Sequence, residues 1–153
     1  MKKTVLLAAL CLAALAHADP APDQTSALHF LDGYYAALKH RDLGALTAMI
    51  APDAPIVVLL NDGGEQKFTL SRAEYLQQIH AVWHFATEEK YDIRNISYHA
   101  AAAGGPALVT LEDNESRTVL GNPSGQRNQL EISLAESGGT IRIVAIKSHT
   151  LIW

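Results

Sequence analysis

Apolar residues recur at helical spacing in three segments of the chain, which predicts three helices. In the first segment, from residue 25 to about residue 40, one face carries Leu28, Leu31, Tyr35 and Leu38, with Ala27 and Tyr34 beside them. Asp42 is a suitable N-cap for a second, short helix, whose apolar side carries Leu43, Leu46, Met49 and Ile50. Ser71 and Glu74 form a capping box for the third helix, whose core face carries Tyr75, Leu76, Ile79, Val82, Trp83 and Ala86.

The other apolar runs follow the pattern of β-strands. Residues 56–60 are five consecutive aliphatic residues, which predicts a buried strand that turns at 61–64 and returns along 66–70. After the third helix we expect strands around 91–96, along 107–119, around 130–134 and along 141–152. Segment 121–125 combines glycine, asparagine and proline, which predicts a hairpin loop.

The last of these strands has apolar residues on both faces. By strand alternation Ile141 and Ile143 face one way, while Val144 and Ile146 face the other. We therefore expect both faces to be covered, and a partner subunit is one candidate for the second cover.

The first eighteen residues have the three parts of a secretory signal peptide. Lys2 and Lys3 give a positive start, residues 5–15 are apolar, and Ala16-His17-Ala18 is a cleavage site. An apolar run of about eleven residues is too short to span a bilayer. The sequence thus predicts a signal peptide (1–18), an N-terminal tether (19–24) and one domain (25–153). The protein is expected to be periplasmic or secreted, with cleavage after Ala18.

Composition limits the partners of the expected mature chain. Its 135 residues suit one domain, and they contain no cysteine because Cys11 leaves with the signal peptide. Removing Lys2 and Lys3 leaves 10 Lys and Arg against 16 Asp and Glu, a net charge of −6 with histidine neutral. This charge disfavours binding to nucleic acids or anionic membranes. We predict no membrane span and no cofactor.

Two neighbouring segments are similar to a known superfamily. Residues 34–46, YYAALKHRDLGAL, place a tyrosine pair a short linker before Asp-Leu, and residues 49–54, MIAPDA, end the second helix before the first strand. This pattern resembles the nuclear transport factor 2-like superfamily, which includes the SnoaL-like and ketosteroid isomerase-like proteins. The resemblance implies an α+β fold: a cone-shaped α+β barrel with helices packed in a curved, mainly antiparallel sheet. It leaves function open, because this fold carries isomerases, dehydratases, cyclases, binding proteins and assembly modules.

The isomerase chemistry of that superfamily transfers poorly to this sequence. Tyr34 falls where the resemblance implies a hydrogen-bond donor to an oxyanion. The same spacing places the general base at Val58, which cannot take a proton. Proton abstraction by the superfamily's usual route is therefore disfavoured.

The candidate ligand-binding residues form a mixed aromatic and polar set: Tyr34, Tyr35, His80, Trp83 and Asp113. No catalytic residue is assigned, and the candidates are Tyr34, His80 and Asp113. Asp113 shares a strand face with Val109 and Leu111, so it is a candidate acid with a raised pKa beside Tyr34. The alternative, which we favour, is that the charges of 112–117 project past the sheet and are solvated.

His80 and His84 stand four residues apart on the third helix, within reach of one metal ion. Two histidines are only half of a metal site, so we predict no metal and keep the pair as a weak candidate. An acid–base role for His80 at a pocket mouth and a solvated helix flank are the other interpretations.

Three functions follow from this reading. The first is an exported domain that binds a small apolar or aromatic molecule in its cone. The second is a non-catalytic, dimeric interaction module of the cell envelope, and the chain is expected to form a homodimer. The third is a SnoaL-like isomerase, dehydratase or cyclase with a non-standard base. Polar groups around a cavity would support the first function, whereas a cavity filled by Leu, Ile and Trp would support the second.

Overall fold

The structure is a computed structural model of the chain, and it describes residues 20–102 and 104–153. The predicted signal peptide, residues 1–18, lies outside the described residues. Within the described part of the chain, no helix is long and apolar enough to cross a membrane.

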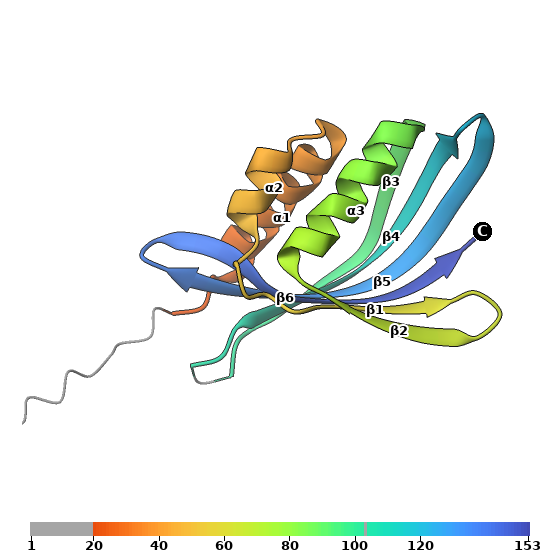
Figure 1. The fold of residues 1–153 in the computed structure, drawn as a ribbon. Helices are drawn as coiled ribbons and strands as arrows, with labels where there is room; N and C mark the ends of the chain where they lie inside the picture. Colours follow the sequence, from red (N-terminus) through yellow and green to blue (C-terminus); the bar gives the residue numbers. More distant parts are fainter. Residues whose placement is uncertain (1–19, 103) are drawn as a thin grey trace, which may run out of the picture.

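In the part of the chain that the structure describes, three helices lie on one face of a six-stranded sheet (Figure 1). The helices are α1 (Gln24–Lys39), α2 (Leu43–Met49) and α3 (Arg72–Phe85). The strands are β1 (Ile56–Asn61), β2 (Glu65–Leu70), β3 (Ala86–His99), β4 (Ala107–Val119), β5 (Asn122–Ser137) and β6 (Thr140–Ile152).

The sheet is open and mixed, with the strand order β2-β1-β6-β5-β4-β3. Strands β3 to β6 form an antiparallel meander, and β1 pairs antiparallel with β2 but parallel with β6. The long β3–β6 strands curve around the helices, so the sheet has a concave inner face (Figure 1). The expected cone of helices in a curved, mainly antiparallel sheet is confirmed, although the sheet does not close into a barrel.

Each helix begins at a side chain that accepts hydrogen bonds from the free N–H groups of the first turn. Asp23 accepts from the Ser26 N–H at 2.8 Å, and Asp42 accepts from the Ala45 N–H at 2.9 Å. Ser71 and Glu74 form the reciprocal capping box that the sequence predicts. Because α3 forms one wall of the cavity described below, its capping box fixes where that wall begins.

Replacing Ser71 by alanine is expected to lower the free energy of unfolding by about 0.5–2 kcal/mol, because it leaves the Glu74 N–H in the first turn of α3 without its acceptor. Ser71→Thr is the matched control, since threonine also caps helices, and it is expected to keep most of the stability. Urea unfolding measures both variants. Equal midpoints for Ser71→Ala and the wild type would contradict this role.

The β4–β5 connection is shorter than the predicted loop. Leu120 and Gly121 form the turn, with φ angles of 50° and 83°, and β5 already begins at Asn122. Positive φ at both central residues is typical of a type I′ hairpin turn. Pro123 is tolerated inside β5 because β6 pairs with β5 only from Gln126 onward, so the missing proline N–H interrupts no ladder.

A bulge in β6 changes the expected pattern of its two faces. The register slips between Ser133 and Leu134, which pair with Ala145 and Ile143 respectively, so Val144 is the extra residue. As a result Ile143 and Ile146 are both buried in the one core. The expectation that these two residues face opposite ways is wrong, and strand alternation alone gave no sign of the bulge.

The core lies between the three helices and the concave face of the sheet. Its largest fully buried side chains are Leu46, Ile50, Ile56, Ile132, Leu134, Ile143, Val109 and Pro22.

Two segment ends differ from the expected ones. Ala86 begins β3 rather than ending α3, and the expected tether is packed at its end, where the Tyr98 hydroxyl donates to the Pro22 carbonyl at 2.8 Å.

Candidate functional site

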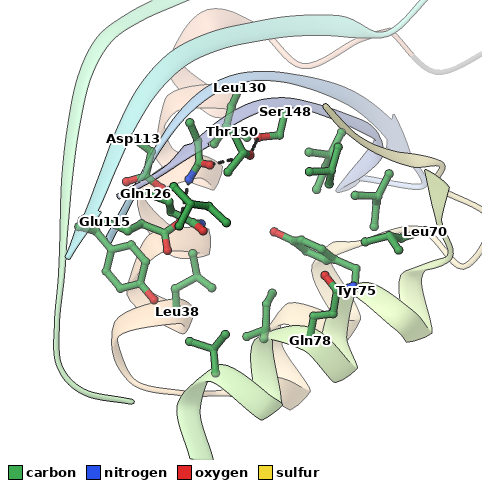
Figure 2. A pocket seen from close by; sticks show the side chains of 18 of the residues that line it. Leu38, Leu70, Tyr75, Gln78, Asp113, Glu115, Gln126, Leu130, Ser148 and Thr150 are labelled. Carbon is green, nitrogen blue, oxygen red and sulfur yellow. Dashed lines mark hydrogen bonds between the residues drawn. The ribbon is translucent and has the colours of Figure 1, made fainter. Parts of the chain in front are cut away.

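A cavity of about 410 Å³ lies between α1, α3 and the concave face of the sheet (Figure 2). Aliphatic and aromatic side chains form most of its wall, including Leu38, Ile56, Val58, Leu70, Ile79, Val82, Trp83 and Leu130. Polar side chains are gathered mainly on β4, β5 and β6, where they are Asp113, Glu115, Arg117, Gln126, Asn128, Ser148 and Thr150. The cavity therefore combines a mostly apolar body with one polar wall, as small-molecule sites usually do.

Strand register creates this polar wall. Asp113 on β4 lies opposite Asn128 on β5, which lies opposite Thr150 on β6. Glu115 lies opposite Gln126 in the next inward row. Residues directly opposite each other share a face of the sheet, so these side chains all point into the cavity. Figure 2 shows Asp113, Glu115 and Gln126 together on one side of it, across from Tyr75 on α3.

A chain of hydrogen bonds runs along this wall toward Glu115. The Thr150 hydroxyl donates to Asn128 Oδ1 at 2.9 Å, so the Ser148 hydroxyl, 2.8 Å away, donates to Thr150. Asn128 Nδ2 then donates to Glu115 Oε1 at 2.9 Å. Every donor in the chain points toward the Glu115 carboxyl, which favours its ionised form.

Asp113 is the most deeply buried carboxyl in this wall, with 2% of the residue exposed. Its Oδ2 accepts a hydrogen bond from the Tyr35 hydroxyl at 3.3 Å, whereas Oδ1 has no hydrogen-bond donor among the described residues. Burial, followed by the negative charge of Glu115, raises the pKa of Asp113 to about 7. The favoured expectation of a solvated Asp113 is therefore wrong, and the tyrosine that bonds to it is Tyr35 rather than Tyr34.

Asp113 and Glu115 share a proton near neutral pH. Burial also raises the pKa of Glu115, but the Arg117 charge and the hydrogen bonds from Gln126 and Asp113 oppose that rise. Arg117 Nη2 lies 3.3 Å from Glu115 Oε2. Because Glu115 has these partners, the shared proton belongs on Asp113, which then donates it toward Glu115.

A third carboxyl, Glu89 on β3, extends the charged cluster. Its Oε2 accepts from Arg41 at 3.1 Å, and its Oε1 lies 4.0 Å from Arg117 Nη1. Arg41 also donates to the Trp83 carbonyl at 2.7 Å and the Ala86 carbonyl at 2.8 Å. The bonds to Trp83 and Ala86 provide donors for backbone carbonyls at the end of α3, and the bond to Glu89 fixes its side chain at the cavity wall.

Tyr34 lies in the wall and bonds to a second tyrosine. Its hydroxyl is 2.7 Å from the Tyr75 hydroxyl on α3, and its ring packs edge-on against Tyr35 at 5.4 Å. Burial raises the pKa of Tyr34 well above its ordinary value and that of Tyr75 to about 12. Both hydroxyls therefore keep their protons at neutral pH and remain hydrogen-bond donors.

Removing either hydroxyl is expected to lower the free energy of unfolding by about 1 kcal/mol, because the other loses its buried partner. A double-mutant cycle with Tyr34→Phe, Tyr75→Phe and both together isolates the bond. We expect the double variant to be about 1 kcal/mol more stable than the sum of the two single changes. Strictly additive effects in urea unfolding would contradict the bond.

The sequence-predicted residues divide into two groups. Tyr34, Tyr35, Trp83 and Asp113 all line the cavity. His80 is exposed and is absent from the wall, which differs from its expected place, because α3 turns Tyr75, Ile79, Val82 and Trp83 toward the cavity instead. That these residues bind a ligand stays a prediction.

His84 is exposed as well, and its ring packs edge-on against Phe85 at 4.7 Å. Over residues 20–102 and 104–153, no three His, Cys, Asp or Glu side chains are arranged to hold a metal ion. The placement of both histidines fits the solvated helix flank that we gave as one interpretation.

From the sequence we did not assign Glu89, Glu115, Arg117, Arg41 or Tyr75 to the site. A signal existed for two of them, because Glu115 and Arg117 follow Asp113 at strand period and must share its face. Val58 lies in the wall, at the position where spacing placed the superfamily's general base, and its side chain supplies only methyl groups there. The carboxyls of the wall come from β3 and β4 instead.

Comparison with known proteins supports the fold. No family model and no curated protein sequence matches the chain. Among solved structures, a nuclear transport factor 2-like protein of unknown function from Pseudomonas putida KT2440 matches over 82% of this chain and 84% of its own, with TM-score 0.63 and 13% identity. The chain has the nuclear transport factor 2-like fold.

Two further solved structures match a similar share of the chain. A candidate scytalone dehydratase from Novosphingobium aromaticivorans DSM 12444 has TM-score 0.67 and 12% identity, over 82% of each chain. LinA has TM-score 0.62 and 12% identity, over 82% of this chain and 86% of its own. At this identity the likeness establishes the nuclear transport factor 2-like fold and not a shared activity, so function must be argued from the site.

Proposed function

We propose that the cavity binds a small, mostly apolar molecule and holds the polar group of that molecule against Asp113. The observation that carries this proposal is the buried Asp113 carboxyl, whose Oδ1 has no donor in the described structure, at the polar wall of an otherwise apolar cavity. A buried acceptor without a donor is costly, and a ligand donor removes that cost. The similar fold of a candidate dehydratase and of LinA is in keeping with a site of this kind.

The interaction-module alternative receives less support. A chain that only assembles with partners has no need for a cavity, and its cone is expected to be filled by large aliphatic side chains. Here about 410 Å³ is open, and polar residues of three neighbouring strands point into it. This inward polar set favours ligand binding.

A thermal-stability screen with small aromatic and aliphatic compounds tests the proposal. A compound at about 100 times its dissociation constant stabilises the folded protein by roughly 2.7 kcal/mol, which is an easily measured rise in melting temperature. We expect hits among compounds that carry one polar group on an apolar body. A screen in which no such compound raises the melting temperature would contradict the proposal.

Acid–base catalysis is a second candidate function, and the pKa of Asp113 near 7 favours it. A carboxyl with that pKa both gives and takes protons at neutral pH, and the Tyr35 hydroxyl orients it. In this role Asp113 would replace the base that Val58 cannot supply.

Asp113→Asn is then expected to abolish turnover of a screened compound. Glu112→Gln, on the opposite face of β4, is expected to keep that turnover. Equal turnover in both variants would count against catalysis.

We also propose export and a homodimer, both on the sequence alone. Residues 1–18 read as a signal peptide, so expression of the full chain in a bacterium should place a shortened protein in the periplasm or medium. An unshortened cytoplasmic protein would contradict export.

Light scattering of the purified protein tests the homodimer, and a monomeric mass would overturn it.

A further inference from the structure

The charged side chains in the cavity wall are unequal in number. Among the described residues that line it, Glu89, Asp113 and Glu115 carry carboxyls, whereas Arg117 carries the one guanidinium. Arg117 pairs with Glu115, and Arg41 pairs with Glu89 from outside the wall. Asp113 forms no ion pair with any described residue, so it is the carboxyl whose charge is left without a cation.

Two carboxyl oxygens of this wall are buried without a hydrogen-bond donor in the described structure. They are Oδ1 of Asp113 and Oε1 of Glu89, whose side chain is 10% exposed. Glu89 Oε1 lies 4.0 Å from Arg117 Nη1, which is too far for a hydrogen bond. Once Asp113 has lost the proton that it donates toward Glu115, both atoms are acceptors, so the missing partner is a donor rather than another acceptor.

Aromatic side chains line the same cavity. Tyr35, whose hydroxyl bonds to Asp113, packs edge-on against Tyr91 with centroids 6.2 Å apart, and Trp83 also lines the wall. The negative faces of such rings attract cations, and tryptophan and tyrosine do so most strongly. Carboxyl acceptors and aromatic rings together favour a positive group over a neutral one.

We propose that the ligand is a protonated primary or secondary amine on an apolar or aromatic body, with its ammonium group bonded to Asp113 Oδ1. This inference rests on the proposed function and names the class of molecule that the site takes. An ammonium brings several N–H donors and a positive charge, whereas an alcohol brings one donor and no charge. A carboxylate ligand would meet Asp113 and Glu89 as like charges.

Binding of an ammonium is expected to compete with the proton on Asp113. The titratable and charged groups that act on this carboxyl are Tyr35 from α1, Tyr75 from α3, and Glu115 and Arg117 on β4. Glu89 and Tyr91 from β3 line the same cavity. With a pKa of about 7, Asp113 must lose its proton before it pairs with the amine. Affinity should therefore rise about tenfold from about pH 6 to about pH 8, and binding near pH 7 should release part of a proton.

Three probes of one shape test the charge requirement by calorimetry: 2-phenylethylamine, 2-phenylethanol and 3-phenylpropionate. We expect the amine to bind at least about tenfold more tightly than the alcohol, and the propionate not to bind. Asp113→Asn should remove the preference for the amine over the alcohol. Its asparagine retains an acceptor for Tyr35 and gains a donor toward Glu115, so the variant should fold. Glu112→Gln is the control and should keep the preference.

The outcomes separate this inference from the proposed function. An alcohol that binds as tightly as the amine overturns the amine assignment and leaves the binding function in place. An amine preference that survives in Asp113→Asn, or that does not rise with pH in the wild type, also overturns it. Failure of all three probes overturns it as well, and the wider thermal screen then decides separately whether the cavity binds anything.

Discussion

Asp113→Asn is expected to make the protein more stable than the wild type above neutral pH, by on the order of 3–4 kcal/mol. The folded protein raises the pKa of Asp113 to about 7, whereas an unfolded aspartate titrates near about 3.9. Between these values the folded state holds a proton that the unfolded state has released. The contribution of Asp113 to wild-type stability therefore falls as the pH rises from about 4 to about 7.

Asparagine has no proton to lose, and it makes the contacts of a protonated Asp113. Its oxygen accepts from Tyr35, and its N–H₂ donates toward Glu115. The gap between the variant and the wild type should thus be small near about pH 4 and largest near about pH 8. Urea unfolding at several pH values measures this gap.

Glu112→Gln serves as the control for this comparison, because Glu112 is the preceding residue and points to the other face of β4. Its stability should follow the wild-type curve. An Asp113→Asn variant that is less stable than the wild type at every pH would show that Asp113 is held as a charged group, contrary to this account.

Val58→Trp is expected to weaken ligand binding by at least about 100-fold, because an indole at this position fills the cavity. Val58 lies in the wall, opposite Ser148 on β6 and Phe68 on β2. Its side chain borders the cavity but is not part of the hydrogen-bonded wall. The variant therefore tests whether the ligand occupies the cavity, without changing the polar groups of the wall. Calorimetry with a compound from the thermal screen gives the affinity.

Val57→Trp provides the matched control, since it adds the same side chain to the neighbouring residue, which points to the outer face of β1. It should bind the compound as the wild type does. Equal loss in both variants would indicate that a tryptophan in β1 disturbs the sheet, and unchanged binding in Val58→Trp would place the ligand outside the cavity.

The sequence was most informative where the structure depends on neighbours along the chain. The N-caps at Asp42 and Ser71 rest on contacts only three residues away, so the starts of α2 and α3 were predictable. The turn between β4 and β5 was harder to predict, because Leu120 adopts a positive φ that its residue type disfavours. The bulge at Val144 was not predictable, since only pairing with β5 reveals it.

The site depended on contacts that no local pattern contains. Alternation placed Asp113 with Val109 and Leu111, but whether that row is buried depends on Tyr35, 78 residues away. The Tyr34–Tyr75 bond spans 41 residues, and the Arg41–Glu89 pair spans 48. His80 was misplaced for a related reason: it flanks the core stripe of α3, and only the packed sheet determines which flank meets the cavity.

A crystal structure of the protein grown with the tightest compound from the screen tests ligand binding at Asp113 most directly. We expect the compound to fill the cavity between α1, α3 and the sheet, with its polar atom about 3 Å from Asp113 Oδ1. A compound bound elsewhere, with this cavity empty or holding only water, would contradict the proposed binding site.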